Sequence, residues 1–214
     1  LAVYAAADRL SCYNCRFTGW QDTIFNGDPM TCNMKKLMLP DFFQASEVPI
    51  VHKFYRNYFK DCYVCGDVDY IFGPNTAFFD HCEIHSIARV SEGKAYITAA
   101  STPAGQEFGL VFSHCRITGE EPDSVYLGRP WRDCAKTAFI CCELGDHICP
   151  EGWQNWGKVR AEVLSDYIEY GNFGPGADCS GRSPLSRCLV NPEVETYFSK
   201  ENVLVGEDGW IPAE

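Results

Sequence analysis

The chain has 214 residues, which is long enough for one domain with a sizeable hydrophobic core. Hydrophobic residues make up 46% of it and charged residues 22%, with 18 glycines and 12 prolines, so the composition predicts a turn-rich globular protein and excludes disorder as its main state. The net charge of −11 argues against a nucleic-acid partner, and no stretch stays apolar over about 18 residues, so we expect no membrane span.

The chain opens on a short apolar run at residues 1–5, and its first methionine is Met30. No basic segment precedes this run, as one would in a secretory signal peptide. We therefore expect a processed or partial chain, whose location is not revealed by a leader sequence.

Cysteines recur along the chain in one local pattern. Each is followed two positions later by an apolar residue, and four of the five follow a phenylalanine by three positions. They are Cys15, Cys62, Cys82, Cys115 and Cys142, at intervals of 47, 20, 33 and 27 residues. Such spacing suits a structural coil of about 20–25 residues interrupted by loops. The pattern predicts an all-β fold, a parallel β-helix in which these cysteines stack as an internal ladder about 4.8 Å apart.

Other groupings of cysteine and histidine suggest a metal site instead. Two Cys-x-x-Cys pairs begin at Cys12 and Cys62, and His81 and His85 are four residues apart. The pairs begin 50 residues apart, and positions i and i+3 of a strand point to opposite faces, so we expect no metal. The total of 13 cysteines is odd, which leaves at least one thiol outside any disulfide.

The remaining histidines show neither ligand nor catalytic-triad spacing. They are His52, His114 and His147. We expect them to be surface or loop-packing residues.

Two segments share the pattern Gly-x-x-Asp-x-Ile-Phe, at residues 19–25 and 66–72. Asp22 and Asp69 each lie seven residues after a cysteine of the ladder, so stacking of the coils would place them on adjacent strands. Two carboxylates at that separation cannot both ionise freely. We expect one pKa to rise, which would set a proton donor beside an ionised partner. The alternative is that each aspartate only caps a turn.

At this point the chain resembles the pectin methylesterase (pectinesterase) family, in a bacterial-like, N-terminally truncated form. Five segments in the same order carry the resemblance, and together they are highly specific. They are residues 19–23 (GWQDT), 66–73 (GDVDYIFG), 95–103 (AYITAASTP), 126–131 (YLGRPW) and 171–177 (GNFGPGA). The resemblance implies a right-handed parallel β-helix that removes methyl esters from pectin, yielding pectate and methanol.

The resemblance also assigns catalytic roles. Asp69 matches the nucleophile, Asp22 the general acid and base, and Arg129 the partner that keeps the nucleophile ionised. Gln21 matches an oxyanion-hole donor, although a turn residue bonded to backbone is an alternative. No metal or organic cofactor is implied, and we expect a monomer that binds homogalacturonan.

The same resemblance assigns substrate binding to aromatic residues. Trp131 matches a platform for a sugar ring, with simple packing as the alternative. Tyr70 and Phe72 flank the nucleophile and are candidates to line the cleft, yet strand alternation could send both into the core.

The chain also departs from the family pattern. We expect one domain over residues 1–214 that lacks its first coils and an upstream glutamine, with residues 26–55 as a loop insertion. Family resemblance favours an extracellular or cell-wall location, while the many cysteines leave a cytoplasmic one open. Two other functions also stay open: a β-helix enzyme that cleaves the polygalacturonide backbone, and a non-catalytic polysaccharide-binding module.

Overall fold

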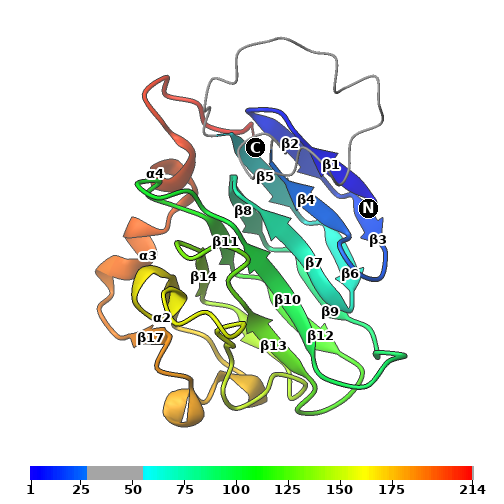
Figure 1. Cartoon of the computed structure of the whole chain (residues 1–214). Helices are drawn as coiled ribbons and strands as arrows, with labels where there is room; N and C mark the ends of the chain where they lie inside the picture. The colour runs from blue at the N-terminus through cyan, green and yellow to red at the C-terminus, as the bar shows by residue number, and fades with distance from the viewer. Residues whose placement is uncertain (28–54, 214) are drawn as a thin grey trace.

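A computed structural model describes residues 1–27 and 55–213 of the chain (Figure 1). Its strands are assigned to three sheets, and within each sheet the neighbouring strands run parallel. Except for the last two strands, which are neighbours in one sheet, successive strands of the described chain fall in different sheets, and each strand pairs with one a full coil away. This winding is that of a parallel β-helix, so the predicted all-β fold is confirmed.

Sheet A carries the strands that follow the two Gly-x-x-Asp segments. In spatial order its members are β1 (Val3–Ala5), β4 (Ile24–Asn26), β7 (Val68–Gly73), β10 (Ala95–Ala100) and β13 (Val125–Gly128). Sheet C is formed by the short strands that follow each cysteine of the ladder. Its members are β15 (Glu143–Leu144), β12 (Arg116–Gly119), β9 (Glu83–Ser86), β6 (Tyr63–Gly66) and β3 (Arg16–Thr18).

Sheet B contains the phenylalanines that precede the cysteines. Its members are β17 (Ser186–Leu189), β16 (Asp166–Tyr170), β14 (Lys136–Ile140), β11 (Leu110–Ser113), β8 (Thr76–Asp80), β5 (Arg56–Lys60) and β2 (Leu10–Tyr13). Short helices complete the described chain, most of them towards its C-terminus. They are α2 (Ala161–Leu164), η1 (Pro175–Ala177), η2 (Cys179–Gly181), α3 (Glu193–Tyr197) and α4 (Lys200–Leu204). Within the described residues no helix is long and apolar enough to span a membrane.

The interior is built from stacked, equivalent side chains of successive coils. The rings of Phe59, Phe79, Phe112 and Phe139 stack in one column, with centroids 4.5–4.7 Å apart and planes within 9° of parallel. Each stack buries apolar surface on both ring faces, which makes the column a large contributor to the core.

The predicted cysteine ladder is also confirmed. Four of its five members are at most 2% exposed, and Cys15, in the first coil, is half-buried. The backbone N–H of Cys15 donates to Cys62 Sγ, and that of Cys62 donates to Cys82 Sγ, both at 3.4 Å. Burial raises the pKa of the Cys115 thiol, so this rung stays neutral. Cys115 therefore acts as a small buried side chain, whereas hydrogen bonds with Cys115 and Cys62 lower the pKa of the Cys82 thiol.

One residue in each coil turns the chain from sheet B into sheet C, directly before the ladder cysteine. Its backbone is left-handed in every case, with φ between 51° and 53°. The positions are Asn14, Asp61, His81, His114 and Cys141. Asparagine, aspartate and histidine adopt this conformation more readily than other side-chain-bearing residues, which explains most of these choices. Cys141 is the exception.

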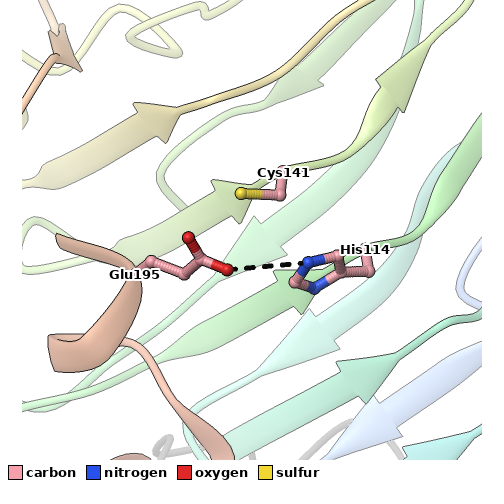
Figure 2. A group of neighbouring side chains, drawn as sticks. All are labelled: His114, Cys141 and Glu195. Atoms are coloured by element: carbon pink, nitrogen blue, oxygen red, sulfur yellow. Dashed lines mark ion pairs between the residues drawn. The ribbon is translucent and has the colours of Figure 1, made fainter. Parts of the chain in front are cut away.

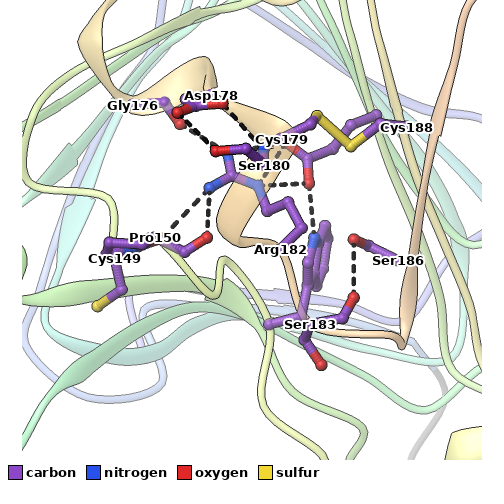
Figure 3. Close-up of a disulfide and its surroundings, with 12 residues drawn as sticks. Cys149, Pro150, Gly176, Asp178, Cys179, Ser180, Arg182, Ser183, Ser186 and Cys188 are labelled. Atoms are coloured by element: carbon purple, nitrogen blue, oxygen red, sulfur yellow. Dashed lines mark hydrogen bonds and ion pairs between the residues drawn. A yellow bond between two sulfur atoms is a disulfide. The ribbon is translucent and has the colours of Figure 1, made fainter.

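The C-terminal part packs against sheet B and is held by a buried ion pair beside a disulfide (Figure 3). Arg182 and Glu169 are 4% and 1% exposed, and Trp153 Nε1–H donates to Glu169 at 2.9 Å. The disulfide joins Cys179 to Cys188. Sequence reasoning had not paired these two cysteines. The expected loop insertion at residues 26–55 lies almost wholly outside the described residues, and Asn26 itself ends strand β4.

Candidate active site

Sheet A places the two shared aspartates on neighbouring coils. Strands β4 and β7 pair with Ile24 opposite Ile71, which sets Asp22 opposite Asp69. The backbone N–H of Asp22 donates to the carbonyl of Val68 at 3.0 Å. The predicted side-by-side placement is therefore confirmed.

Both aspartates have left-handed backbone, with φ of 59° at Asp22 and 50° at Asp69. A non-glycine residue held in this region costs free energy and is concentrated at functional sites. This repeated conformation aims both carboxylates out of the regular strand alternation.

A buried ion pair fixes the carboxylate of Asp69. Arg129 follows β13, and its Nε and Nη2 donate to the two Asp69 oxygens at 2.8 and 2.7 Å. The Arg129 and Asp69 side chains are 15% and 8% exposed, so this two-point contact is shielded from most of the solvent. The predicted partnership of Arg129 with Asp69 is present in the geometry.

The guanidinium of Arg129 lies between two aromatic rings. Its Cζ lies 3.8 Å from the centroid of Tyr96 and 3.7 Å from that of Trp156. The Arg129 backbone N–H donates to the carbonyl of Thr98 at 3.0 Å. Aromatic faces on both sides attract the cation and prevent it from rotating away from Asp69.

The two carboxyls have different surroundings. Burial and the neighbouring charge of Asp69 raise the pKa of Asp22 to about 6, against a weaker opposing effect of Arg129. Burial also raises the pKa of Asp69, but hydrogen bonds from Arg129 and the positive charges of Arg129 and Lys158 oppose that rise. Arg129 forms a two-point ion pair with Asp69 and not with Asp22. Asp22 is therefore the carboxyl that keeps a proton more readily.

Three other residues assigned to the site lie near the pair. Gln21 directly precedes Asp22 and is exposed. Trp131 is half-buried, and its backbone N–H donates to the carbonyl of Ala100 at 2.9 Å. The Trp131 ring packs edge to face on Phe72, with ring centroids 5.6 Å apart. Phe72 is 4% exposed and packs with Phe25 and Ala99 in a cluster distinct from the main core. Phe72 therefore packs against the Trp131 ring and supports its position.

Tyr70 does not line the site, contrary to the expectation. It is fully buried in the main core, and its hydroxyl hydrogen-bonds to Ser86 Oγ at 2.9 Å. The left-handed turn at Asp69 breaks the alternation of β7, so Tyr70 and Phe72 lie in different clusters. Tyr70 is thus a core residue.

Sequence reasoning missed Tyr96, Trp156 and Lys158. Lys158 Nζ donates to the carbonyls of Pro130 and Trp131 at 2.6 and 3.1 Å, which ties it to the segment that follows Arg129. Tyr96 lies within a segment already singled out, where its outward position in β10 was a usable signal. Trp156 and Lys158 lie in the loop after β15. No sequence pattern within that loop predicts that it packs beside Arg129.

Two groups of ligand-type residues come close enough to hold a metal within residues 1–27 and 55–213. One is His114, Cys141 and Glu195, and the other combines Glu169 with the disulfide cysteines. Neither contains the Cys-x-x-Cys pairs, because those cysteines belong to the β-helix interior and its strands. Neither adjoins Asp69.

The fold and this carboxylate pair define a β-helical class of protein with solved representatives. The structure is similar to the pectin methylesterase from carrot, with a TM-score of 0.74 and 25% identity over 94% of this chain and 58% of that chain. It is similar also to the pectin methylesterase from Aspergillus niger, with a TM-score of 0.67, 28% identity, and coverage of 94% of this chain and 55% of that one.

Among curated proteins, the chain is 36% identical to Pectinesterase 31 of Arabidopsis thaliana over 195 residues, which cover 90% of this chain and 52% of that protein. The family model for pectinesterases matches residues 44–207. The chain therefore belongs to the pectinesterase family. It spans about half the length of the curated relatives it matches.

Proposed function

We propose that this chain carries a carboxylic ester hydrolase site that removes methyl esters from the galacturonate units of pectin. The observation that carries the proposal is the Asp69 carboxylate, clasped by Arg129 at two points beside Asp22, a second carboxyl whose pKa is raised to about 6. This arrangement supplies an aimed nucleophile and a proton donor in one site. Pectin methylesterases of similar fold support the choice of substrate.

In the proposed first step, an oxygen of Asp69 bonds to the ester carbonyl carbon, and the carbonyl oxygen becomes an oxyanion. Gln21, which directly precedes Asp22, is the residue proposed to donate a hydrogen bond to that oxygen. When the oxyanion collapses, the carbon–methoxide bond breaks and Asp22 gives its proton to the methoxide. Methanol leaves, and an anhydride joins Asp69 to the sugar.

In the second step Asp22, now ionised, takes a proton from water, which attacks the carbonyl carbon of the former ester. The bond to Asp69 breaks, the galacturonic acid unit leaves and gives its carboxyl proton to the solvent, and both aspartates return to their starting states. Arg129 acts throughout by holding the Asp69 oxygens in one orientation. Trp131, supported by Phe72, is the platform proposed for a sugar ring.

The test is methanol release from highly esterified pectin by the native chain, by Asp69→Asn and by Asp22→Asn. We expect both variants to lose activity by about 10³-fold or more, since each removes a group that acts directly in bond making or proton transfer. Asp61→Asn is the matched control, because Asp61 lies at a B-to-C turn where Asn14 shows that asparagine is accepted. It should retain full activity.

Other outcomes separate the alternatives. Shortening of the polymer without methanol would indicate backbone cleavage. Binding of pectin without turnover by the native chain would indicate a binding module. Either result contradicts the esterase proposal.

Several finer points belong to the same proposal. We place the protein outside the cell or in the cell wall, which the Cys179–Cys188 disulfide supports, since such bonds persist in oxidising compartments. There it would act as a monomer on homogalacturonan, in cell-wall modification and pectin catabolism. The bacterial-like character and the single domain stay predictions.

A further inference from the structure

The left-handed turns that lead from sheet B into sheet C bring ligand-type side chains of successive coils together. His114 follows β11 and Cys141 follows β14, and these two strands pair with Ser113 opposite Ile140. His114 and Cys141 are therefore equivalent positions of adjacent coils, both with φ of 53°. Their side chains stand side by side on a rigid backbone.

A third group arrives from a distant part of the chain. Glu195 lies in α3, and its Oε1 is 3.7 Å from His114 Nε2. Figure 2 shows the imidazole, the thiol and the carboxylate converging from three segments. The candidate ligand atoms of all three residues lie within 4.8 Å of one another.

These separations suit a small tetrahedral ion. Bonds of about 2.0–2.3 Å to nitrogen, oxygen and sulfur place tetrahedral ligand atoms about 3.3–3.8 Å apart. The upper end applies to two sulfur ligands, and a nitrogen and an oxygen ligand lie about 3.3–3.5 Å apart. The His114 to Glu195 separation of 3.7 Å is slightly longer than that. Side-chain rotation of the half-buried Cys141 and the exposed Glu195 would close the remaining gaps. The coordination sphere then holds three protein ligands and one open position.

Two further observations favour a ligand role over chance proximity. Ser113 Oγ hydrogen-bonds to His114 Nδ1 at 3.0 Å, which orients the ring so that Nε2 faces Glu195. Cys141 occupies a left-handed turn position that the preceding coils fill with asparagine, aspartate or histidine. Cysteine has no preference for this left-handed backbone, so we infer that the thiol is the reason for a cysteine at this position.

We propose that His114, Cys141 and Glu195 form a zinc-type metal site that ties helix α3 to the wall of the β-helix. Imidazole, thiolate and carboxylate together suit Zn²⁺ better than the oxygen-seeking Mg²⁺ or Ca²⁺. Helix α3 already packs against the segment that leads into β11, because the Tyr197 and Phe108 ring centroids are 5.1 Å apart. Metal binding adds a second anchor through Glu195. Such a site would differ from the expectation that the chain holds no metal and that His114 is only a packing residue.

The test uses the whole chain, stripped with a chelator and titrated with Co²⁺ as a spectroscopic substitute for Zn²⁺. We expect one ion per chain to produce a thiolate-to-metal charge-transfer band together with the visible bands of tetrahedral cobalt. Cys141→Ser should abolish the charge-transfer band, and Cys134→Ser, at another half-buried free cysteine, should leave it intact.

The other two ligands are tested by matched pairs. His114→Asn and Glu195→Gln should each weaken Zn²⁺ binding by about tenfold or more. His85→Asn, a histidine of sheet C whose ring stacks on Tyr63, and Glu193→Gln, in the same helix as Glu195, should not. Glu195→Gln alters an exposed residue and leaves the fold intact, so its result stands even if a cysteine variant folds poorly.

A stability readout completes the test. Zn²⁺ should raise the unfolding temperature of the native chain and not that of Glu195→Gln, because a ligand that binds only the folded state stabilises it. A charge-transfer band that survives Cys141→Ser, or a native chain that binds no stoichiometric Co²⁺, would overturn the proposal. Neither readout depends on esterase activity.

Discussion

Asp69 and Arg129 are 60 residues apart in sequence and form the best-defined charged contact at the site. Burial makes this contact strong, and it makes an unpaired Asp69 costly. The aromatic rings on both faces of Arg129 add a geometric demand, because a flat guanidinium fits between Tyr96 and Trp156 and a tetrahedral ammonium does not.

Arg129→Lys should therefore lower kcat by about 10²–10³-fold, the range for loss of one electrostatic partner in a shielded active site. Lysine keeps the charge and loses the two-point contact and the stacking. The measurement is initial-rate kinetics of methanol release. Arg116→Lys, at an exposed pair with Glu83, is the control. Full activity in Arg129→Lys would show that charge alone suffices.

The raised pKa of Asp22 predicts a pH dependence. Proton donation to methoxide requires protonated Asp22, and its pKa is about 6 in the folded chain. As pH rises through that value Asp22 loses the proton, so kcat/KM should fall by about tenfold per pH unit above it. A pH–rate profile measures this fall. A kcat/KM that keeps rising from pH 6 to 8 would contradict the assignment of Asp22 as the acid.

The same coupling can be observed without turnover. Burial raises the pKa of Asp22 first, and the charge of Asp69 raises it further. Asp69→Asn removes that charge, so the pKa of Asp22 should fall, as measured by carboxyl ¹³C NMR titration. Asp61→Asn should leave it unchanged. An unchanged pKa of Asp22 in Asp69→Asn would mean that the two carboxyls do not interact.

At the scale of the elements, stability comes from columns of equal side chains in successive coils. Phe112 lies within its column, stacked on Phe79 at 4.7 Å and on Phe139 at 4.5 Å. Its removal would leave a cavity that its neighbours, fixed by their own strands, cannot close.

Phe112→Ala should lower the free energy of unfolding by about 3–5 kcal/mol, the usual cost of truncating a buried phenylalanine. Denaturant unfolding followed by circular dichroism measures it. Phe173→Ala is the matched control, because Phe173 is 57% exposed and its loss should cost little. Equal effects in the two variants would contradict the central role of the column.

At the scale of the molecule, the net charge of −11 bears on which polymer the site accepts. A methyl-esterified stretch of pectin is neutral, and the de-esterified product is a polyanion. Long-range repulsion should therefore help to expel product, in proportion to the ester groups removed.

Binding to pectin should weaken as esterification falls, and added salt should narrow the difference because it screens repulsion. The measurement is calorimetric titration of Asp69→Asn, which prevents turnover, with pectins of stepped esterification at two ionic strengths. Equal affinity for fully de-esterified polymer would remove charge as a source of selectivity.

The amino-acid sequence was sufficient to predict the β-helix, the cysteine ladder and the pairing of Asp22 with Asp69. These features depend on period-two strands and on one repeat stacked on the next, so that residues at equal distances from a ladder cysteine become neighbours. Residue spacing alone carries that information. The assignment of Gln21 and Trp131 came from family resemblance and stays a prediction about roles.

Only the tertiary structure decided what lies beyond the repeat. The left-handed backbone at Asp69 breaks strand alternation and sends Tyr70 into the core, although the residue pattern of β7 does not show it. The contact of the Trp156 ring with Arg129 depends on where the loop after β15 packs against the β-helix. The contact of Glu195 with His114 likewise depends on where helix α3 packs. Such returns are set by packing over the whole molecule, which no local periodicity encodes.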